Sequence, residues 1–454
     1  MLVELPPSAR RHHEHPITNT TRCAATASAL REAAPYIAAM LTAAVLGFAQ
    51  LLVIDAWGQR RGADLRDLLG KWDADWLTGI ADHGYLRVPG RDPFESVAFF
   101  PGYPTLVRVV AAPLVIFDVG DATFLAAMIV SITSSILLAG GLARLVIDVA
   151  QRLRPWPLDV GTRVVLSVAA TAITFGAPMS VMYWMPYSEA MFTALAVWAL
   201  AAILRRRYLA AGILVLFAGL TRLTALALIA TLCAAALVEL WRYLRYRKAF
   251  APARFPVPAV IAPVIGSVGI AAYLSWSSYR TRSAGGYFAV QDKGWGSGFD
   301  WGGSTWEWLQ HNTIIPATDP NSIGFAISSW SMILAAALCA VTVWPLLRRR
   351  LPWQIWVTAT AAAAIVLGSG GTMHARPRLL LFATMLLLVL LAVPLLDMGT
   401  VMVHRMQHGA SPFAADRRHL HYVLVDSGMS VGEAIGVLVA ASAAAGIAGI
   451  VLPL

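Results

Sequence analysis

Two carboxylates lie close together in a polar segment that follows the first apolar stretch. The segment 71–85 reads KWDADWLTGIADHGY. Asp73 and Asp75 are two residues apart, so a helix would point them in different directions. Partial desolvation near a bilayer raises the pKa of a carboxyl group and suits it to act as a general base. We expect Asp73 to be that base and Asp75 to be the reserve candidate, whereas the alternative is that both are merely solvated.

The same segment predicts how the carboxylates are positioned. Trp72, Trp76 and Ile80 recur at a spacing of four residues, which gives a short helix one apolar face. Such a helix lies in the membrane interface. Gly84 is placed to end it.

Arginine side chains are the second possible source of chemistry, because a guanidinium binds phosphate through paired hydrogen bonds. Arg222 stands between two apolar stretches, and Arg376 and Arg378 follow His374 at the start of another. Charges at such positions are costly and tend to be functional. We expect these four residues to bind a phosphate group, although Arg376 and Arg378 are equally suited to reach lipid headgroups. Glu189 stands at the start of a further apolar stretch. It is expected either to supply the negative charge that a helix N-terminus favours or to orient an arginine.

The composition identifies the class of protein in which these residues lie. Of 454 residues, 58% are hydrophobic and 13% are charged, and the mean hydropathy is +0.65. A soluble domain has about 25% charged residues. The chain is therefore predicted to be an all-α polytopic membrane protein. The net charge of +10 does not indicate nucleic acid, because many of the cations cluster in short loops between apolar stretches.

About eleven membrane spans are expected, since a span needs about 20 apolar residues. They are 34–55, 122–145, 160–178, 187–204, 208–220, 222–240, 255–275, 323–346, 351–369, 379–397 and 431–453. The arginine-rich loops then all lie inside, and the polar segments 56–98 and 276–322 lie outside. The apolar segment 99–117 contains Arg108 and three prolines. If this segment crossed the membrane fully, the arginine-rich loop at 144–154 would lie outside. We therefore expect a re-entrant or interfacial element.

This topology divides the chain into four parts. Residues 1–33 are expected to form a cytoplasmic tail, 34–397 the transmembrane module, 398–430 a cytoplasmic segment and 431–454 a final span. The three cysteines are far apart, and no His/Asp cluster has the spacing of metal ligands, so neither a metal nor another cofactor is expected. We expect a bacterial plasma-membrane protein with its site on the periplasmic face.

Several motifs resemble the PIG-V-type mannosyltransferases, the GPI mannosyltransferase II-like family of the glycosyltransferase C superfamily, in its bacterial branch. The clearest pair is WDADWLTGIADHGY from Trp72 and AFFPGYPTL from Ala98. Leu77 departs from the family pattern, which has tyrosine there. Weaker matches, in the same order as in the family, are PYSEAMF from Pro186, GLTR from Gly219, AVQ followed by WG at 289–296, and RPRL from Arg376.

The resemblance implies a glycosyltransferase C-type fold and an inverting transfer of mannose from polyprenyl-phosphate-mannose. Asp73 would deprotonate an acceptor hydroxyl, which attacks the sugar opposite the phosphate. Arg222 and Arg378 would stabilise the departing polyprenyl phosphate. Residues of these motifs are expected to contact substrate: Trp72, His83, Tyr85, Tyr103, Tyr187, Glu189, Gln291 and Trp295. The implied partners are the lipid donor, a glycolipid or other envelope acceptor, and membrane lipid.

Three alternatives remain open. One is transfer of another sugar, such as arabinose, on the same fold. Another is a flippase or transporter of lipid-linked sugars, which would require paired charges near mid-bilayer and broken helices in both halves. A third is a non-catalytic scaffold, which would tolerate loss of Asp73. The aromatic residues of 276–322 are equally consistent with a sugar platform and with an interfacial aromatic belt.

Overall fold

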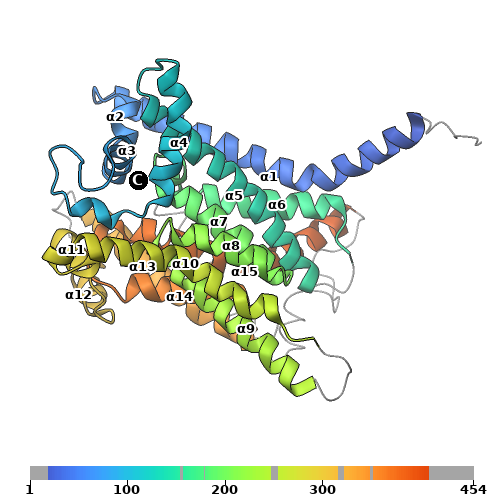
Figure 1. The fold of residues 1–454 in the computed structure, drawn as a ribbon. Helices are drawn as coiled ribbons and strands as arrows, with labels where there is room; N and C mark the ends of the chain where they lie inside the picture. Colours follow the sequence, from blue (N-terminus) through green and yellow to red (C-terminus); the bar gives the residue numbers. More distant parts are fainter. Residues whose placement is uncertain are drawn as a thin grey trace, which may run out of the picture.

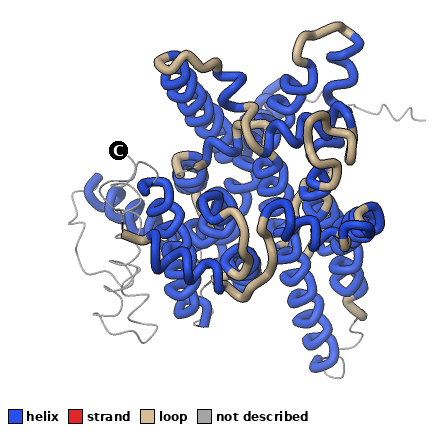
Figure 2. Tube along the Cα trace, turned by 90° about the vertical axis from the view of Figure 1, so that its left-hand side faces the viewer, coloured by secondary structure: helices blue, strands red, loops and turns tan. Residues whose placement is uncertain are grey.

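The computed structural model describes residues 19–153, 157–177, 179–246, 254–314, 322–347 and 351–407, and this part of the chain is all-α (Figures 1 and 2). It contains 15 α-helices and one isolated β-bridge, between Phe299 and Ser369. The helices of the main bundle are α1 (Asn19–Gln59), α5 (Ala122–Leu153), α6 (Val160–Phe175), α7 (Ser188–Leu204), α8 (Tyr208–Gly219), α9 (Leu226–Tyr246), α10 (Val257–Arg280), α13 (Ser322–Leu347), α14 (Trp353–Leu367) and α15 (Arg376–Gln407). The remaining helices are α2 (Leu65–Leu69), α3 (Asp73–His83), α4 (Gly102–Ile116), α11 (Tyr287–Trp295) and α12 (Gly303–Asn312).

The bundle has the apolar exterior of a polytopic membrane protein. Within the described ranges, six helical segments are long and apolar enough to cross a bilayer: Ser28–Gln59, Ala122–Arg152, Leu223–Tyr246, Val257–Arg280, Ile323–Leu347 and Met373–Leu391. Their outward faces expose large apolar side chains, such as Phe48 on α1 and Val264 on α10. Aliphatic surface of this kind is stable against lipid and unstable against water. Four other bundle helices, α6, α7, α8 and α14, are apolar but shorter.

The bundle has two ends, and each consists of helix termini and the segments that connect them. The "site end" contains α2, α3, α4, α11 and α12 and lies to the left in Figure 1, where the segments 56–98 and 276–322 come together as expected. The "arginine end" is opposite and contains the turns around Arg152, Arg205 and Arg242, which are joined by ion pairs and hydrogen bonds. Successive bundle helices run in alternating directions between the two ends.

Helix α7 occupies the centre of the bundle, where nearly every side chain is buried. It packs between α5 and α8, and α8 packs closely against α10. That closeness depends on glycine, because a Cβ atom on Gly269 would lie 2.2 Å from the carbonyl oxygen of Leu216. Small residues at helix interfaces are the usual way in which membrane helices approach each other. The packing fixes the starts of α7 and α9, where two of the candidate site residues lie.

Helix α4 does not run from one end of the bundle to the other, which fits a re-entrant as well as an interfacial element at 99–117. It has 15 residues and a length of about 22 Å. Tyr103 near its start contacts Ala127 and Ser131, which lie in the first three turns of α5. The turn after α4 returns to the site end, because Asp121 pairs with Arg66 at 2.6 Å. Both ends of α4 therefore lie toward the same end of the bundle.

The chain termini differ in part from the expected division. Residues 19–33, assigned to a polar tail, belong to α1, and Figure 1 shows the first turns of α1 extending beyond the other helices. Similarly, α15 continues to Gln407, past the boundary expected at 397. The rest of the expected segment 398–430 and the expected span 431–453 lie outside the described residues.

The position of α4 predicts which residues can be labelled from the same side of the membrane. In a cysteine-free background, Arg87→Cys before α4 and Gly120→Cys after it should react with a membrane-impermeant maleimide from one side. Arg207→Cys at the arginine end should react from the other side. All three positions are exposed. Labelling of positions 120 and 207 from a common side, opposite to 87, would show that α4 crosses the membrane.

Candidate functional site

Helix α3 presents Asp73 to the interior of the site end and Asp75 to its surface. Trp76 and Ile80 are each 4% exposed and anchor the helix, and Gly84 ends it with φ of 79° and an N–H bonded to the carbonyl of Ile80. Both features agree with the predicted amphipathic helix. Trp72 does not belong to the apolar face of this helix that the spacing predicted, because its side chain precedes the helix and is 68% exposed.

The two carboxylates have different partners. Asp73 Oδ2 lies 2.9 Å from Arg378 Nη2, and both side chains are mostly buried. Asp75 is exposed and pairs with Arg91, whose guanidinium also lies over the ring of Trp76. A pair exposed to solvent contributes little stability. The structure therefore places Asp73, and not Asp75, among the interior charges.

A line of four alternating charges begins at Asp73. Arg378 Nε lies 3.3 Å from Glu189 Oε1, and Arg222 Nη1 lies 2.9 Å from the same oxygen. The Glu189 side chain is 7% exposed. Because two guanidinium groups share one buried carboxylate oxygen, Glu189 fixes the separation and orientation of both arginines. Asp73, Arg378, Glu189 and Arg222, called the "charge line" below, have no net charge.

Four separate elements contribute to the charge line. Asp73 and Glu189 lie in the first turns of α3 and α7, where the helix dipole favours negative charge. Arg378 lies in the first turn of α15. Arg222 follows the end of α8 and also donates to Ser188 Oγ at 3.1 Å. The Arg222 turn is held by α4, because Gly102 N donates to the carbonyl of Leu220 at 2.6 Å.

Three tyrosines predicted to bind substrate support the site, Tyr103 and Tyr187 from buried positions and Tyr85 from a half-buried one. Tyr187 lies under Arg378, with 5.3 Å from the guanidinium carbon to the ring centre, and donates to the carbonyl of Lys71 at 3.0 Å. Tyr103 hydrogen-bonds to α5, and Tyr85 donates to the carbonyl of Phe99 at 2.7 Å. Burial raises the pKa of the Tyr85 hydroxyl well above its usual value, so it stays a donor. Each of the three hydroxyl groups donates to a backbone carbonyl of another segment and so links two parts of the site.

An aromatic group joins the two long polar segments beside α3. Trp76 stacks on Phe99 with 5.6 Å between ring centres, and Trp295 packs edge-on against both. Trp295 Nε1 and Gln291 Nε2 are buried donors that have no hydrogen-bond partner among the described residues. A buried donor without a partner costs free energy unless a ligand or water satisfies it. These two N–H groups are therefore free to donate to a bound molecule.

Three more predicted residues lie apart from the charge line. Arg376 is buried and donates to the carbonyls of Val366, Ser369 and Gly370, so its guanidinium caps the end of α14. It is committed to those carbonyls and is not placed to bind a phosphate. His374 and His83 are exposed, and no contact joins either to the charge line. In the described part of the chain, no three His, Cys, Asp or Glu side chains are grouped as metal ligands would be.

Some residues that complete the site were not expected there from the sequence. Arg91 determines where Asp75 points, and Ser188 accepts a hydrogen bond from Arg222. Trp76 and Phe99 form the platform for Trp295. Both aromatic residues stand within the two clearest motifs, which was the available signal. Nothing in the local sequence of Arg91 distinguishes it from other loop arginines.

Comparisons with known proteins give local similarity only. No model of a protein family matches the chain, and no solved structure matches it. Short stretches are similar to undecaprenyl-phosphate alpha-N-acetylglucosaminyl 1-phosphate transferases. The protein from Yersinia pestis is 33% identical over 62 residues, 14% of this chain and 17% of its own length. The protein from Escherichia coli K12 is 35% identical over 54 residues, which are 12% of this chain and 15% of that protein's length. These matches span less than a fifth of each relative.

The position of Glu189 predicts a large loss of stability when its charge is removed. Glu189→Gln leaves two buried guanidinium groups without their shared carboxylate. We expect the free energy of unfolding in detergent to fall by about 3 kcal/mol. Asp121→Asn is the matched control, because it breaks an exposed pair with Arg66 and should change stability by less than about 1 kcal/mol. Equal stability of the two variants would show that Glu189 does not hold the arginines together.

Proposed function

We propose that the protein is a membrane glycosyltransferase that moves a sugar, mannose by resemblance, from a polyprenyl-phosphate donor to an envelope acceptor. The observation that carries the proposal is the charge line. Four segments that the resemblance singled out separately, around Asp73, Glu189, Arg222 and Arg378, supply its four charges. A base beside two arginines is the set of groups that transfer from a sugar phosphate requires.

The contacts suggest how base and leaving group are coupled. An acceptor hydroxyl gives its proton to Asp73 as its oxygen bonds to the anomeric carbon. The bond from that carbon to the phosphate oxygen breaks, and the polyprenyl phosphate leaves with one more negative charge. Protonated Asp73 attracts Arg378 less, so Arg378 can turn its charge to the phosphate, together with Arg222. Attack opposite the phosphate inverts the configuration, so a β-linked donor yields an α-linked product.

The surroundings of the charge line suit a lipid-linked sugar. Helix α4 exposes apolar side chains, among them Val109 and Ile116, beside the site. A polyprenyl chain can lie against such a surface without entering water. On the other side, Trp295 and Gln291 offer the buried donors described above for sugar hydroxyls. Stacking of a sugar on aromatic rings and hydrogen bonds to its hydroxyls would then orient the anomeric carbon toward Asp73.

The fold supports this proposal at the level of topology. Ten described helices alternate between the two ends, and we infer that all ten cross the membrane, with the bilayer thinned locally around the shorter ones. With the expected span at 431–453 they make the eleven of a glycosyltransferase C-type arrangement. The arginine loops would be cytoplasmic by the positive-inside rule. The charge line would then face the periplasm of a bacterial cell.

A second candidate is transfer of a sugar 1-phosphate to a polyprenyl phosphate. The local similarity to the undecaprenyl-phosphate transferases favours it. Both reactions involve a polyprenyl phosphate and would use the arginines in the same way. They differ in the group moved, because only glycosyl transfer breaks the bond between the sugar and its phosphate. Arabinosyl transfer and transport of a lipid-linked sugar remain alternatives from the sequence.

Transfer from radiolabelled polyprenyl-phosphate-mannose in membranes tests the proposal. Asp73→Asn should lower turnover at least about a hundredfold, because it removes the base but keeps the size of the side chain. Asp75→Asn should retain most of the activity, since its carboxylate faces solvent and Arg91. The reverse pattern would reassign the base to Asp75. Incorporation of N-acetylglucosamine 1-phosphate, but not mannose, would favour the second candidate.

Treatment with a chelator tests the expectation that the arginines replace a metal ion. Sugar transfer should be unchanged, within about twofold, after EDTA treatment, because Arg222 and Arg378 supply positive charge for the leaving phosphate. The measurement is the initial rate in washed membranes before and after addition of Mg²⁺ or Mn²⁺. Loss of activity that a divalent cation restores would contradict this account.

A further inference from the structure

A polar cavity lies at the arginine end, opposite to the charge line. Its volume is about 390 Å³, it is partly open to the surroundings, and it is lined by the turn between α7 and α8, the later turns of α9 and the first turn of α14. Its polar walls contain Arg152, Arg206, Arg242, Glu239, Tyr208 and Gln354. We call it the "arginine-end cavity". No step proposed for sugar transfer uses any of these residues.

The walls of the cavity have an excess of positive charge. Three arginines face one carboxylate, which leaves two positive charges without a counter-ion among the lining residues. Glu239 holds two of the arginines in place, because Oε1 lies 2.8 Å from Arg242 Nη1 and 3.6 Å from Arg206 Nη2. Tyr208 also donates to this oxygen at 3.1 Å. Each guanidinium has five N–H groups, so both arginines keep donors for an anion.

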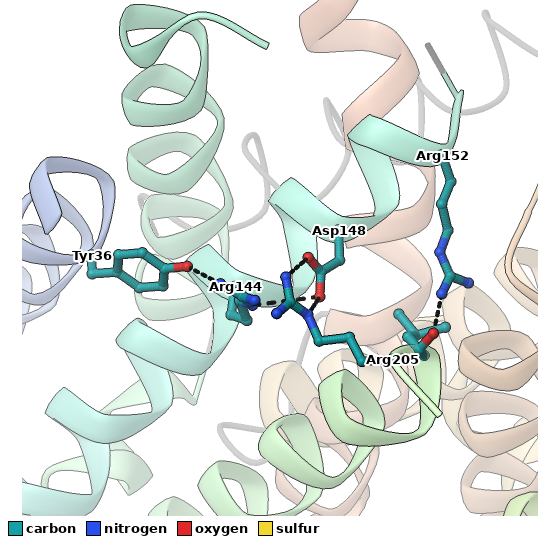
Figure 3. A network of polar contacts seen from close by, with 6 residues as sticks. Tyr36, Arg144, Asp148, Arg152 and Arg205 are labelled. Carbon is teal, nitrogen blue, oxygen red and sulfur yellow. Dashed lines mark hydrogen bonds and ion pairs between the residues drawn. The ribbon is translucent and has the colours of Figure 1, made fainter. Parts of the chain in front are cut away.

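The α7–α8 turn is fixed by a neighbouring network (Figure 3). Arg205 makes two hydrogen bonds of 2.7 Å to the buried carboxylate of Asp148 on α5. Arg144 lies 3.6 Å from the same carboxylate and bonds to the hydroxyl of Tyr36 on α1. Arg152 donates to the carbonyl of Leu204. This network satisfies Asp148 internally, so Arg206, the next residue, is positioned at the cavity without sharing that carboxylate.

Two further properties favour a phosphate group joined to an apolar body. Helices α8 and α14 begin at Tyr208 and Trp353, which line the cavity, and helix N-termini attract anions. The remaining walls are apolar, with Leu204, Val238 and Trp353 among them. Basic pockets between membrane helices on the cytoplasmic side suit anionic lipid headgroups.

We propose that the arginine-end cavity binds a phosphate group, either the headgroup of an anionic phospholipid or a free phosphate. The phosphate oxygens accept hydrogen bonds from Arg206 and Arg242, and Arg152 adds positive charge. A ligand here ties α5, α8, α9 and α14 together at the end of the bundle opposite to the charge line. The site is independent of the proposed transferase activity.

Titration calorimetry on the purified full chain in a neutral detergent tests this proposal. The probes are dihexanoyl-phosphatidylglycerol, dihexanoyl-phosphatidylcholine and inorganic phosphate at constant ionic strength. We expect the anionic lipid to bind and the zwitterionic lipid to bind at least tenfold more weakly. Phosphate as strong a ligand as the anionic lipid would identify free phosphate as the source, whereas weaker phosphate binding would identify the lipid headgroup.

Charge variants connect the binding to this cavity. Arg206→Gln with Arg242→Gln should weaken binding of the anionic probe at least tenfold. Arg245→Gln with Arg254→Gln removes the same charge from exposed positions outside the cavity and should leave binding unchanged. Gln354→Glu adds a repelling charge without breaking an ion pair, so it tests the site even if the first variant fails to fold. Equal binding of both lipids, or wild-type affinity in Gln354→Glu, would overturn the proposal.

Discussion

The candidate site depends on one buried carboxylate oxygen. Glu189 Oε1 accepts contacts from Arg222 and Arg378, which come from distant parts of the chain. Two guanidinium groups would otherwise repel each other in a poorly solvated environment, and neither would have a defined position. With Glu189 between them they form a fixed pair of donors. Arg378 can then also reach Asp73, so the proposed base is positioned through the same oxygen.

The rest of the fold can be understood as the support for this arrangement. Helix α7 is buried at the centre of the bundle and carries Glu189 at its start. Close packing of α8 on α10 places the turn that contains Arg222, and α4 holds that turn through the Gly102–Leu220 hydrogen bond. Arg376 caps α14 and thereby fixes the start of α15, which carries Arg378. A residue predicted to bind substrate thus contributes by positioning its neighbour.

The sequence predicted the elements better than the direction of individual side chains. The all-α membrane bundle and the amphipathic helix ended by Gly84 follow from composition, periodicity and charge, and the structure agrees with both. The expected re-entrant or interfacial element at 99–117 is a helix with both ends toward the site end. Asp73 and Asp75, and likewise Arg376 and Arg378, are two residues apart, so a helix turns them to nearly opposite sides. Only packing decides which member of each pair joins the charge line, and packing depends on distant segments that a local motif does not contain.

Binding of radiolabelled polyprenyl-phosphate-mannose to the purified protein tests the central claim most directly, because it separates the holding of the donor from its chemistry. The account predicts saturable binding that polyprenyl phosphate displaces and free mannose does not. Arg378→Gln should weaken this binding at least tenfold, whereas Asp73→Asn should bind the donor and fail to transfer its sugar. Unchanged affinity in Arg378→Gln, or displacement by mannose alone, would contradict the claim that the charge line holds the donor phosphate.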